Sequence, residues 1–422
     1  MTTWRRFRRP TAAKRLAADG PHFDAFAFFR RTLIIVTNRD PLPADQLSTS
    51  PPTVPPLDLP PREEPSPAAE PVNVAKAAAE KLDAVELATT SSDLTRDPRL
   101  VNDLIAMIRE SADKLESDQA SRGDLKIISR TLRELRYAFK VFASYRGRRK
   151  VTVFGSARTR PEEPAYEQAI QFGSAIARHD WLVVTGAASG IMEAGHRGAG
   201  RDHSMGVYIM LPFEQSANPV IAGDPKLVHM KYFFTRKLMF VKECDAVCLL
   251  PGGFGTLDEG LEVLTLLQTG KRDMVPVVFL DAPGGGFWRE WHEFVTRRLL
   301  ADRLISPEDL SLYRLTDSVE EAVDEILGFY RVFHSQRYSR NKLVFRLRAA
   351  PSAETLEAIN RQFSDILVDG AFALRGPLTE EKDEPQIAHL PRLVFRFNRR
   401  SLGRLRQLID FLNRNVAPPE ED

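Results

Sequence analysis

The spacing of apolar positions changes along the chain and divides it into regions. Residues 75–87 and 98–146 carry apolar side chains at helical spacing, as at Leu100, Leu104 and Ile108. Such stripes predict amphipathic helices that pack on a neighbouring surface. From Lys150 onward, short apolar runs alternate with amphipathic stretches, which is typical of a parallel sheet with helices on both faces. We therefore expect a helical region at 75–148 and an α/β domain at 149–333.

The α/β region contains enough alternating segments for a doubly wound parallel sheet. Strands are expected at residues 151–154, 182–184, 206–210, 246–250 and 275–280 and near Leu312, and helices at about 166–179, 190–200, 233–243, 256–269, 286–300 and 319–333. In an open sheet of this kind, ligands bind outside the carboxyl ends of the strands. Any site should therefore be built from the turns that follow the strands.

The N-terminal part of the chain is basic and rich in proline, whereas the C-terminal part has the pattern of a folded domain. Residues 1–31 carry eight basic residues, and 11 of the 29 prolines fall between Pro41 and Pro71. Residues 1–74 are therefore expected to be a disordered tail and linker, with a nucleic-acid or organelle address as the alternative for the basic part. The run at 32–37 remains unassigned. Residues 341–416 predict strand, helix, two strands and helix, which indicates a small α+β domain with a sensing, dimerising or purely structural role.

Three glycine-bearing turns follow expected strands. They comprise Gly155 and Ser156, the segment from Gly186 to Gly190, and the segment 251–256 with the sequence PGGFGT. Glycines let the backbone turn sharply and approach a ligand closely, and the first turn of a helix offers unpaired N–H groups to an anion. The PGGFGT turn, with Gly252, Gly253, Gly255 and Thr256, is therefore interpreted as a phosphate site. The alternative is an ordinary turn between a strand and a helix.

Charged residues flank this turn. Glu259 lies about one helical turn beyond it, and Glu262 shares its helix face. Arg236 and Lys237 occupy the first turns of the preceding helix. A phosphate anchor, a carboxylate and an arginine suit cleavage of an N-ribosidic bond in a nucleotide, because the transition state places positive charge on the sugar and the base departs with negative charge. The alternatives are a solvated helix face for Arg236 and Lys237 and a surface position for Glu262.

Composition narrows the classes of function. The net charge of +2 argues against bulk attraction to nucleic acid, and no apolar run is long enough to span a membrane. Cys244 and Cys248 are expected to be small buried groups in a reducing, cytoplasmic setting. The eight histidines and two cysteines show no metal-ligand spacing. We therefore expect neither a metal nor another cofactor.

The segment PGGFGTLDEGLEVLTLLQTGK, together with TRK, the GSA turn and GAASGIMEA, resembles the Lonely Guy (LOG) family of nucleotide phosphoribohydrolases. The resemblance covers about residues 150–329. It implies a Rossmann-like fold, a homodimer or higher homo-oligomer, and hydrolysis of nucleoside 5′-monophosphates to a free base and ribose 5-phosphate. The flanking regions resemble those of longer bacterial members.

The resemblance also implies roles for individual residues. Glu259 and Arg236 correspond to the catalytic pair, with Lys237 beside them. The glycines and Thr256 of the PGGFGT turn would hold the phosphate, and Thr265 would line the substrate. Phe234 and Thr235 depart from the His-Glu of plant-type members, and Ala187 and Ala188 replace two glycines. The departures leave the preferred base open. The loop with Glu214 and Asn218 is either base-facing or a connector.

Two other functions are weighed against this hydrolase. One is a non-catalytic nucleotide sensor that signals through the C-terminal domain. The other is amino-acid decarboxylation, which normally requires pyridoxal phosphate on a lysine. Lys237 is the only lysine near the expected site. Nucleotide binding without turnover would favour the sensor.

Overall fold

The structure is a computed structural model that describes residues 98–418 except 211–215 and 383. The described residues belong to one compact unit, Asn73–Asp422. The expected tail at 1–74, the run at 32–37, the helix at 75–87 and Glu214 lie outside the described residues. In the part that is described, no helix combines the length and apolar character needed to cross a membrane.

A seven-stranded sheet, in which every neighbouring pair is parallel, forms the centre of the α/β region. Its strands are β1 (Lys150–Phe154), β2 (Leu182–Thr185), β3 (Ser204–Ile209), β4 (Leu227–Met230), β5 (Ala246–Leu249), β6 (Val277–Leu280) and β7 (Arg314–Thr316), in the order β4-β3-β2-β1-β5-β6-β7. β1 to β6 are buried along almost their whole length. The predicted doubly wound, Rossmann-like sheet is confirmed, and the strand order reverses between β1 and β5.

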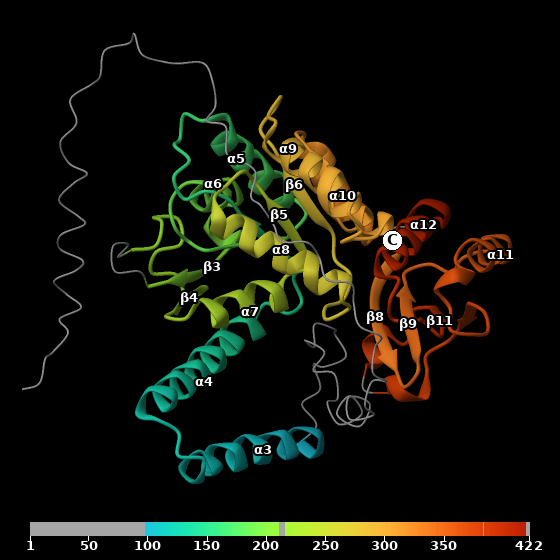
Figure 1. Cartoon of the computed structure of the whole chain (residues 1–422), viewed down its shortest axis with the longest axis horizontal. Helices are drawn as coiled ribbons and strands as arrows, with labels where there is room; N and C mark the ends of the chain where they lie inside the picture. Colours follow the sequence, from blue (N-terminus) through green and yellow to red (C-terminus); the bar gives the residue numbers. More distant parts are fainter. Residues whose placement is uncertain (1–97, 211–215, 383, 419–422) are drawn as a thin grey trace, which may run out of the picture. The chain divides into compact units, whose positions relative to one another are not determined.

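Helices cover both faces of this sheet (Figure 1). On one face, α5 (Pro164–Ala177) packs against α6 (Ile191–Ala199) and α10 (Val319–Phe329). The connection through α8 (Phe254–Gln268) runs from β5 to β6, in the opposite direction along the sheet. Right-handed crossovers therefore place α8 on the other face. The strand order changes direction at β1 and β5, so the crevice of the fold opens beyond their carboxyl ends.

Several expected boundaries differ from those observed. β4 was not predicted, because its four residues include the exposed His229 and give no apolar run. The last strand begins at Arg314, while Leu312 ends a short 3-10 helix. The expected helix at 286–300 is the α-helix α9 (Phe287–Phe294) followed by a π-helical segment (Val295–Leu300). Residues 98–146 contain two helices, α3 (Pro98–Ser117) and α4 (Arg122–Ala143).

The expected closing helix at 319–333 is shorter than predicted. It ends at Phe329, and Phe333 begins β8 (Phe333–Ser339), the first strand of a second sheet. This antiparallel sheet has the order β10-β11-β9-β8, with β9 (Lys342–Leu347), β10 (Ala373–Arg375) and β11 (Arg392–Phe395). The helices α11 (Ala353–Gln362) and α12 (Leu402–Asn415) complete the C-terminal module, defined here as residues 333–416.

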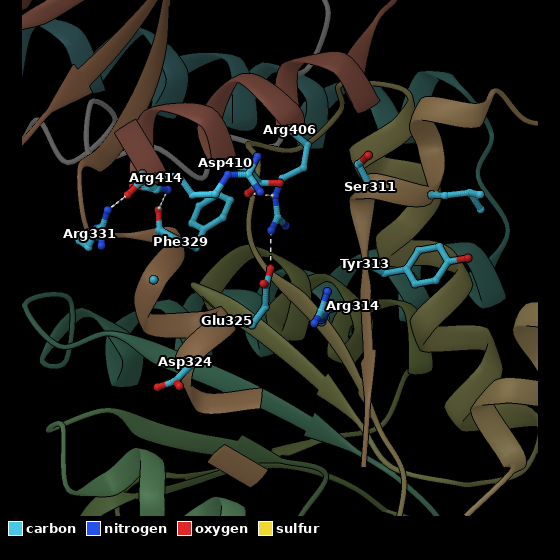
Figure 2. Close-up of a pocket in the computed structure, with 13 residues that line it drawn as sticks. Ser311, Tyr313, Arg314, Asp324, Glu325, Phe329, Arg331, Arg406, Asp410 and Arg414 are labelled. Carbon is cyan, nitrogen blue, oxygen red and sulfur yellow. Dashed lines mark hydrogen bonds and ion pairs between the residues drawn. The ribbon is translucent and has the colours of Figure 1, made fainter. Parts of the chain in front are cut away.

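The C-terminal module is joined to the α/β region through α12. Figure 2 shows Arg406 of α12 directed at Glu325 of α10 and at Asp410 of its own helix. The Asn413 side chain accepts the N–H groups of Val332 and Phe333 at 2.8 and 3.1 Å. A buried arginine with two carboxylates and a buried amide fix how this helix lies on α10.

Candidate active site

The three glycine turns meet at the carboxyl edge of the parallel sheet. The Ser156 N–H donates to the Pro251 carbonyl at 3.1 Å, which links the turns after β1 and β5. The Ile191 N–H donates to the Ser156 carbonyl at 3.0 Å, which links the turns after β1 and β2. The structure therefore brings Gly155, Ser156 and the two other turns together, as the positions of the strands predict.

Close packing explains the glycines that touch a neighbouring turn. A Cβ at Gly252 would lie 2.2 Å from Thr256 Oγ1 and 2.9 Å from the Ser156 nitrogen. Gly190 has φ +65°, and a Cβ there would lie 2.3 Å from the Ser156 carbonyl oxygen. These positions exclude a side chain because the turns are in contact.

Gly253 and Gly255 have no such neighbour. No atom lies within 4 Å of where their Cβ atoms would stand. Their bare backbone faces open space at the start of α8, where Thr256 and Leu257 donate their N–H groups to the Gly253 carbonyl at 3.0 and 3.1 Å. A helix start with unpaired N–H groups and open space beside its glycines can admit an anion.

Lys237 is surrounded by the carboxylates of α8. Its Nζ lies 2.8 Å from Asp258 Oδ2, 3.6 Å from Glu259 Oε2 and 2.6 Å from Glu262 Oε2. Burial would lower the pKa of Lys237, but the three carboxylates outweigh it and hold the pKa above its usual value. Lys237 is therefore a charged ammonium group that links α7 (Phe233–Glu243) to α8.

Glu259 is the least solvated carboxylate of this group. Its side chain is 12% exposed, against 35% for Glu262 and 67% for Asp258. Its Oε2 is buried and accepts no hydrogen bond from the described residues. Burial raises the pKa of Glu259 to about 7, although Lys237 and Arg236 oppose the rise. A carboxyl group with this pKa can exchange a proton near neutral pH.

Arg236 points away from its neighbour Lys237 and towards the sheet. Its Nε donates to the Val207 carbonyl at 2.8 Å and its Nη2 to the Gly186 carbonyl at 3.4 Å. A Cβ at Gly186 would lie 2.0 Å from Arg236 Nη2, so glycine is needed for this arginine to reach the crevice. Consecutive residues of α7 thus place one cation at the second glycine turn and another at α8.

Among the described residues, Thr265 forms no hydrogen bond with the members of this group. It is exposed on α8, and its hydroxyl donates to the Leu261 carbonyl at 2.7 Å. In the described part of the chain, its hydroxyl forms no hydrogen bond with the glycine turns or with Glu259, so its place at the substrate site stays a prediction.

Two supporting networks were not predicted. Glu134 of α4 accepts the Thr235 hydroxyl at 2.8 Å and the Lys231 N–H at 2.9 Å, so the helix before the α/β region holds the start of α7. Glu134 is 5% exposed. The only sequence signal was an acidic residue among the apolar positions of α4, and its partner lies about 100 residues away.

The second network fixes the turn after β2. The Asn218 side chain donates to the Ala188 carbonyl at 3.2 Å and contacts His196 Nδ1 at the same distance. His196 is buried beside Thr185, and burial lowers its pKa to about 4, so its ring is neutral. Asn218 is thus a buried tether for the glycine turn, which favours the connector interpretation for this residue.

A family model and several known proteins match part of this chain. Residues 185–326 match the family model described as "Possible lysine decarboxylase". A cytokinin riboside 5′-monophosphate phosphoribohydrolase of Arabidopsis thaliana is 32% identical over 183 residues, which cover 39% of this chain and 80% of that protein. A pyrimidine/purine nucleotide 5′-monophosphate nucleosidase of Escherichia coli strain K12 is 29% identical over 147 residues, 32% of each chain.

Among solved structures, the molybdenum cofactor binding protein of Rippkaea orientalis is 22% identical, with a TM-score of 0.30, and the match covers 42% of this chain and 94% of that protein. The similarity to the Arabidopsis phosphoribohydrolase extends over most of that protein. The chain belongs to the Lonely Guy (LOG) family.

Proposed function

We propose that this protein hydrolyses the N-glycosidic bond of nucleoside 5′-monophosphates and releases a free base and ribose 5-phosphate. The observation that carries the proposal is Glu259, a nearly buried carboxyl group with a pKa of about 7, placed one helical turn beyond an open glycine turn. Relatives named for this reaction, on cytokinin and on purine and pyrimidine nucleotides, support it.

The phosphate is held at the start of α8. The open backbone at Gly253 and Gly255 lets the 5′-phosphate approach the N–H groups, and Gly252 and Thr256 shape the turn. The rest of the phosphate site is formed by the two other glycine turns, with Gly155, Ser156, Gly186 and Gly190. The positive end of the helix dipole favours the bound anion. The phosphate then positions the sugar so that C1′ faces the next turn of the helix.

Glu259 acts on the sugar and the attacking water, and Arg236 acts on the departing base. The Glu259 carboxylate stabilises the positive charge that develops on the sugar and accepts a proton from the attacking water. Arg236, held over the second turn by Val207 and Gly186, offsets the negative charge on the departing base. Lys237 and Glu262 keep Glu259 in place through their contact at 2.6 Å. Thr265 is proposed to line the outer part of the substrate site.

The state of Lys237 argues against decarboxylation through a Schiff base. A lysine that forms such a bond must be available as a neutral amine, which requires a lowered pKa. Lys237 lies against three carboxylates and its pKa is raised. Its ammonium group is thereby held in the charged form that cannot attack a carbonyl.

The oligomeric state is part of the same proposal. α4 exposes Leu125, Ile128 and Leu132 by 41, 43 and 51%, and α3 exposes Leu104 and Ile108 by 56 and 52%. Apolar stripes of this length favour contact with a second copy of the chain. We expect light scattering to give at least twice the mass of one chain, and a monomer at micromolar concentration would contradict this part.

The test of the activity is a product assay. Purified protein is incubated with AMP, GMP, CMP, UMP and an isopentenyladenine nucleotide, and free base and ribose 5-phosphate are separated by chromatography. We expect both products in equal amounts from at least one nucleotide. Nucleotide binding with neither product formed would instead support a non-catalytic sensor.

A further inference from the structure

A second cavity lies at the opposite edge of the parallel sheet from the glycine turns. Its volume is about 450 Å³, and its core wall includes Arg149 before β1, Asp245 before β5 and Val275 before β6. The other wall comes from the C-terminal module, with His334 of β8 and Arg348 after β9. We call it the junction cavity. Parallel strands start at one edge and end at the other, so a ligand here is remote from Glu259.

The junction cavity has more cations than carboxylates. Five arginines line it, Arg146, Arg148, Arg149, Arg272 and Arg348, against the two aspartates Asp245 and Asp273. Arg148 pairs with Asp180 at 2.5 Å, and Arg149 pairs with Asp245 at 3.3 Å. Among the described residues, no carboxylate pairs with Arg146, Arg272 or Arg348. Three positive charges at this junction therefore lack a counter-charge.

Arg272 is the innermost of these three. The residue is 3% exposed, and its two terminal nitrogens contact the Cys244 sulfur and carbonyl. Its Nε is buried without a hydrogen-bond partner among the described residues. Removing a guanidinium from water without a balancing charge is unfavourable, and an anion in the adjoining cavity would offset this cost.

Arg149 and Arg348 both contact Tyr330. The Arg149 guanidinium carbon lies 3.5 Å from the centre of the Tyr330 ring, and Arg348 Nε donates to the Tyr330 carbonyl at 3.0 Å. Burial and the charge of Arg149 both lower the pKa of Arg348. Burial and the same arginines lower the pKa of His334 to about 4. The cavity wall therefore carries a positive potential that its own residues do not neutralise.

We propose that the junction cavity binds a phosphate-bearing anion whose charge is balanced by Arg146, Arg272 and Arg348. Guanidinium groups match phosphate oxygens with parallel N–H donors, and a phosphate carries enough charge to engage several of them. The volume also admits a ligand larger than one phosphate group. Such a ligand contacts both the segment before β1 and the end of β9, so it bridges the α/β region and the C-terminal module.

Inorganic pyrophosphate is the probe for this site. The full-length protein is titrated calorimetrically at constant ionic strength, with ribose 5-phosphate present in excess to occupy the glycine turns. We expect the double variant R146Q/R348Q to bind pyrophosphate at least tenfold more weakly than the unchanged protein. Both residues are exposed, so the variant should fold, which a thermal melt checks.

Arg361→Gln is the matched control, because Arg361 is an exposed arginine of α11 with no carboxylate partner among the described residues. It should bind pyrophosphate like the unchanged protein. Equal affinity in the double variant, or an equal loss in the control, would overturn the proposal. Hydrogen exchange gives a second measurement, in which pyrophosphate should slow exchange in β8 and β9 of the unchanged protein but not of the double variant.

Discussion

Glu259→Gln should make this protein more stable at alkaline pH while it removes the activity. The Glu259 pKa rises from 4.5 to about 7 on folding, mainly because the group is buried. Each pH unit corresponds to about 1.4 kcal/mol, so keeping this carboxylate ionised in the folded state costs up to about 3 kcal/mol. Glutamine has nearly the same shape and no charge, and it avoids that cost.

The sign of the pH dependence follows from the direction of the shift. Between pH 4.5 and 7 the folded protein keeps a proton on Glu259 that the unfolded chain releases. The stabilisation from this proton is complete below pH 4.5 and is lost as the pH rises through about 7. The glutamine variant does not lose stability in this way. Its unfolding free energy should therefore exceed that of the unchanged protein by about 1 kcal/mol at pH 5 and by about 3 kcal/mol at pH 8.

The assay is denaturant unfolding of both proteins at pH 5, 6, 7 and 8, combined with the nucleotide product assay. Turnover should fall about 10²- to 10⁴-fold, as expected when a general acid or base is lost. Glu262→Gln is the matched control, because it removes a carboxylate from the same helix and the same lysine but at a side chain that is 35% exposed. It should give no stabilisation. A difference between Glu259→Gln and the unchanged protein that stays constant with pH would refute the reasoning.

Three further predictions concern other parts of the molecule. Arg236→Lys should lower kcat at least 100-fold, because a single ammonium group cannot reproduce the fork of the guanidinium; steady-state kinetics checks this. Gly252→Ala should lower the unfolding free energy by about 1–3 kcal/mol through overpacking, which a thermal melt detects. Gly255→Ala should fold normally but bind nucleotide more weakly, which a nucleotide titration detects. Glu381→Gln should lower the unfolding free energy by about 3–5 kcal/mol, because the buried Arg392 then has no carboxylate among the described residues, whereas Arg346 keeps Glu384; denaturant unfolding measures the loss.

The parallel sheet could be predicted because its strands are local signals. β1, β2 and β5 are short apolar runs that end in glycine turns, and the rule for open sheets brings those turns to one edge. β4 and β8 could not be predicted in the same way. β4 is short and partly exposed, and in the mostly polar β8 only every third residue is buried, so β8 lacks the alternation typical of a strand and forms through pairing with β9.

In the candidate site too, features that are local in the sequence could be predicted, and features that depend on distant residues could not. The PGGFGT turn, Glu259 and Arg236 are recognisable because their residue types and spacing carry the chemistry within a short segment. The raised Glu259 pKa and the hydrogen bonds of Glu134 and Asn218 depend on burial and on partners far away in the sequence. Such properties exist only once the chain is folded. The role of Thr265 was implied by the family resemblance and stays a prediction, because its exposed hydroxyl donates only within its own helix.

The contact between Glu134 and Thr235 has a consequence for how small this enzyme can be made. A chain shortened to begin at β1 would still contain every glycine turn and both Arg236 and Glu259. It would lack the Glu134 carboxylate, which accepts the Lys231 N–H and the Thr235 hydroxyl, and that hydroxyl would keep only the Tyr232 carbonyl at 2.9 Å. The first turn of α7 would then lose its hydrogen bond to α4. The shortest chain that holds Arg236 in its position therefore includes α4.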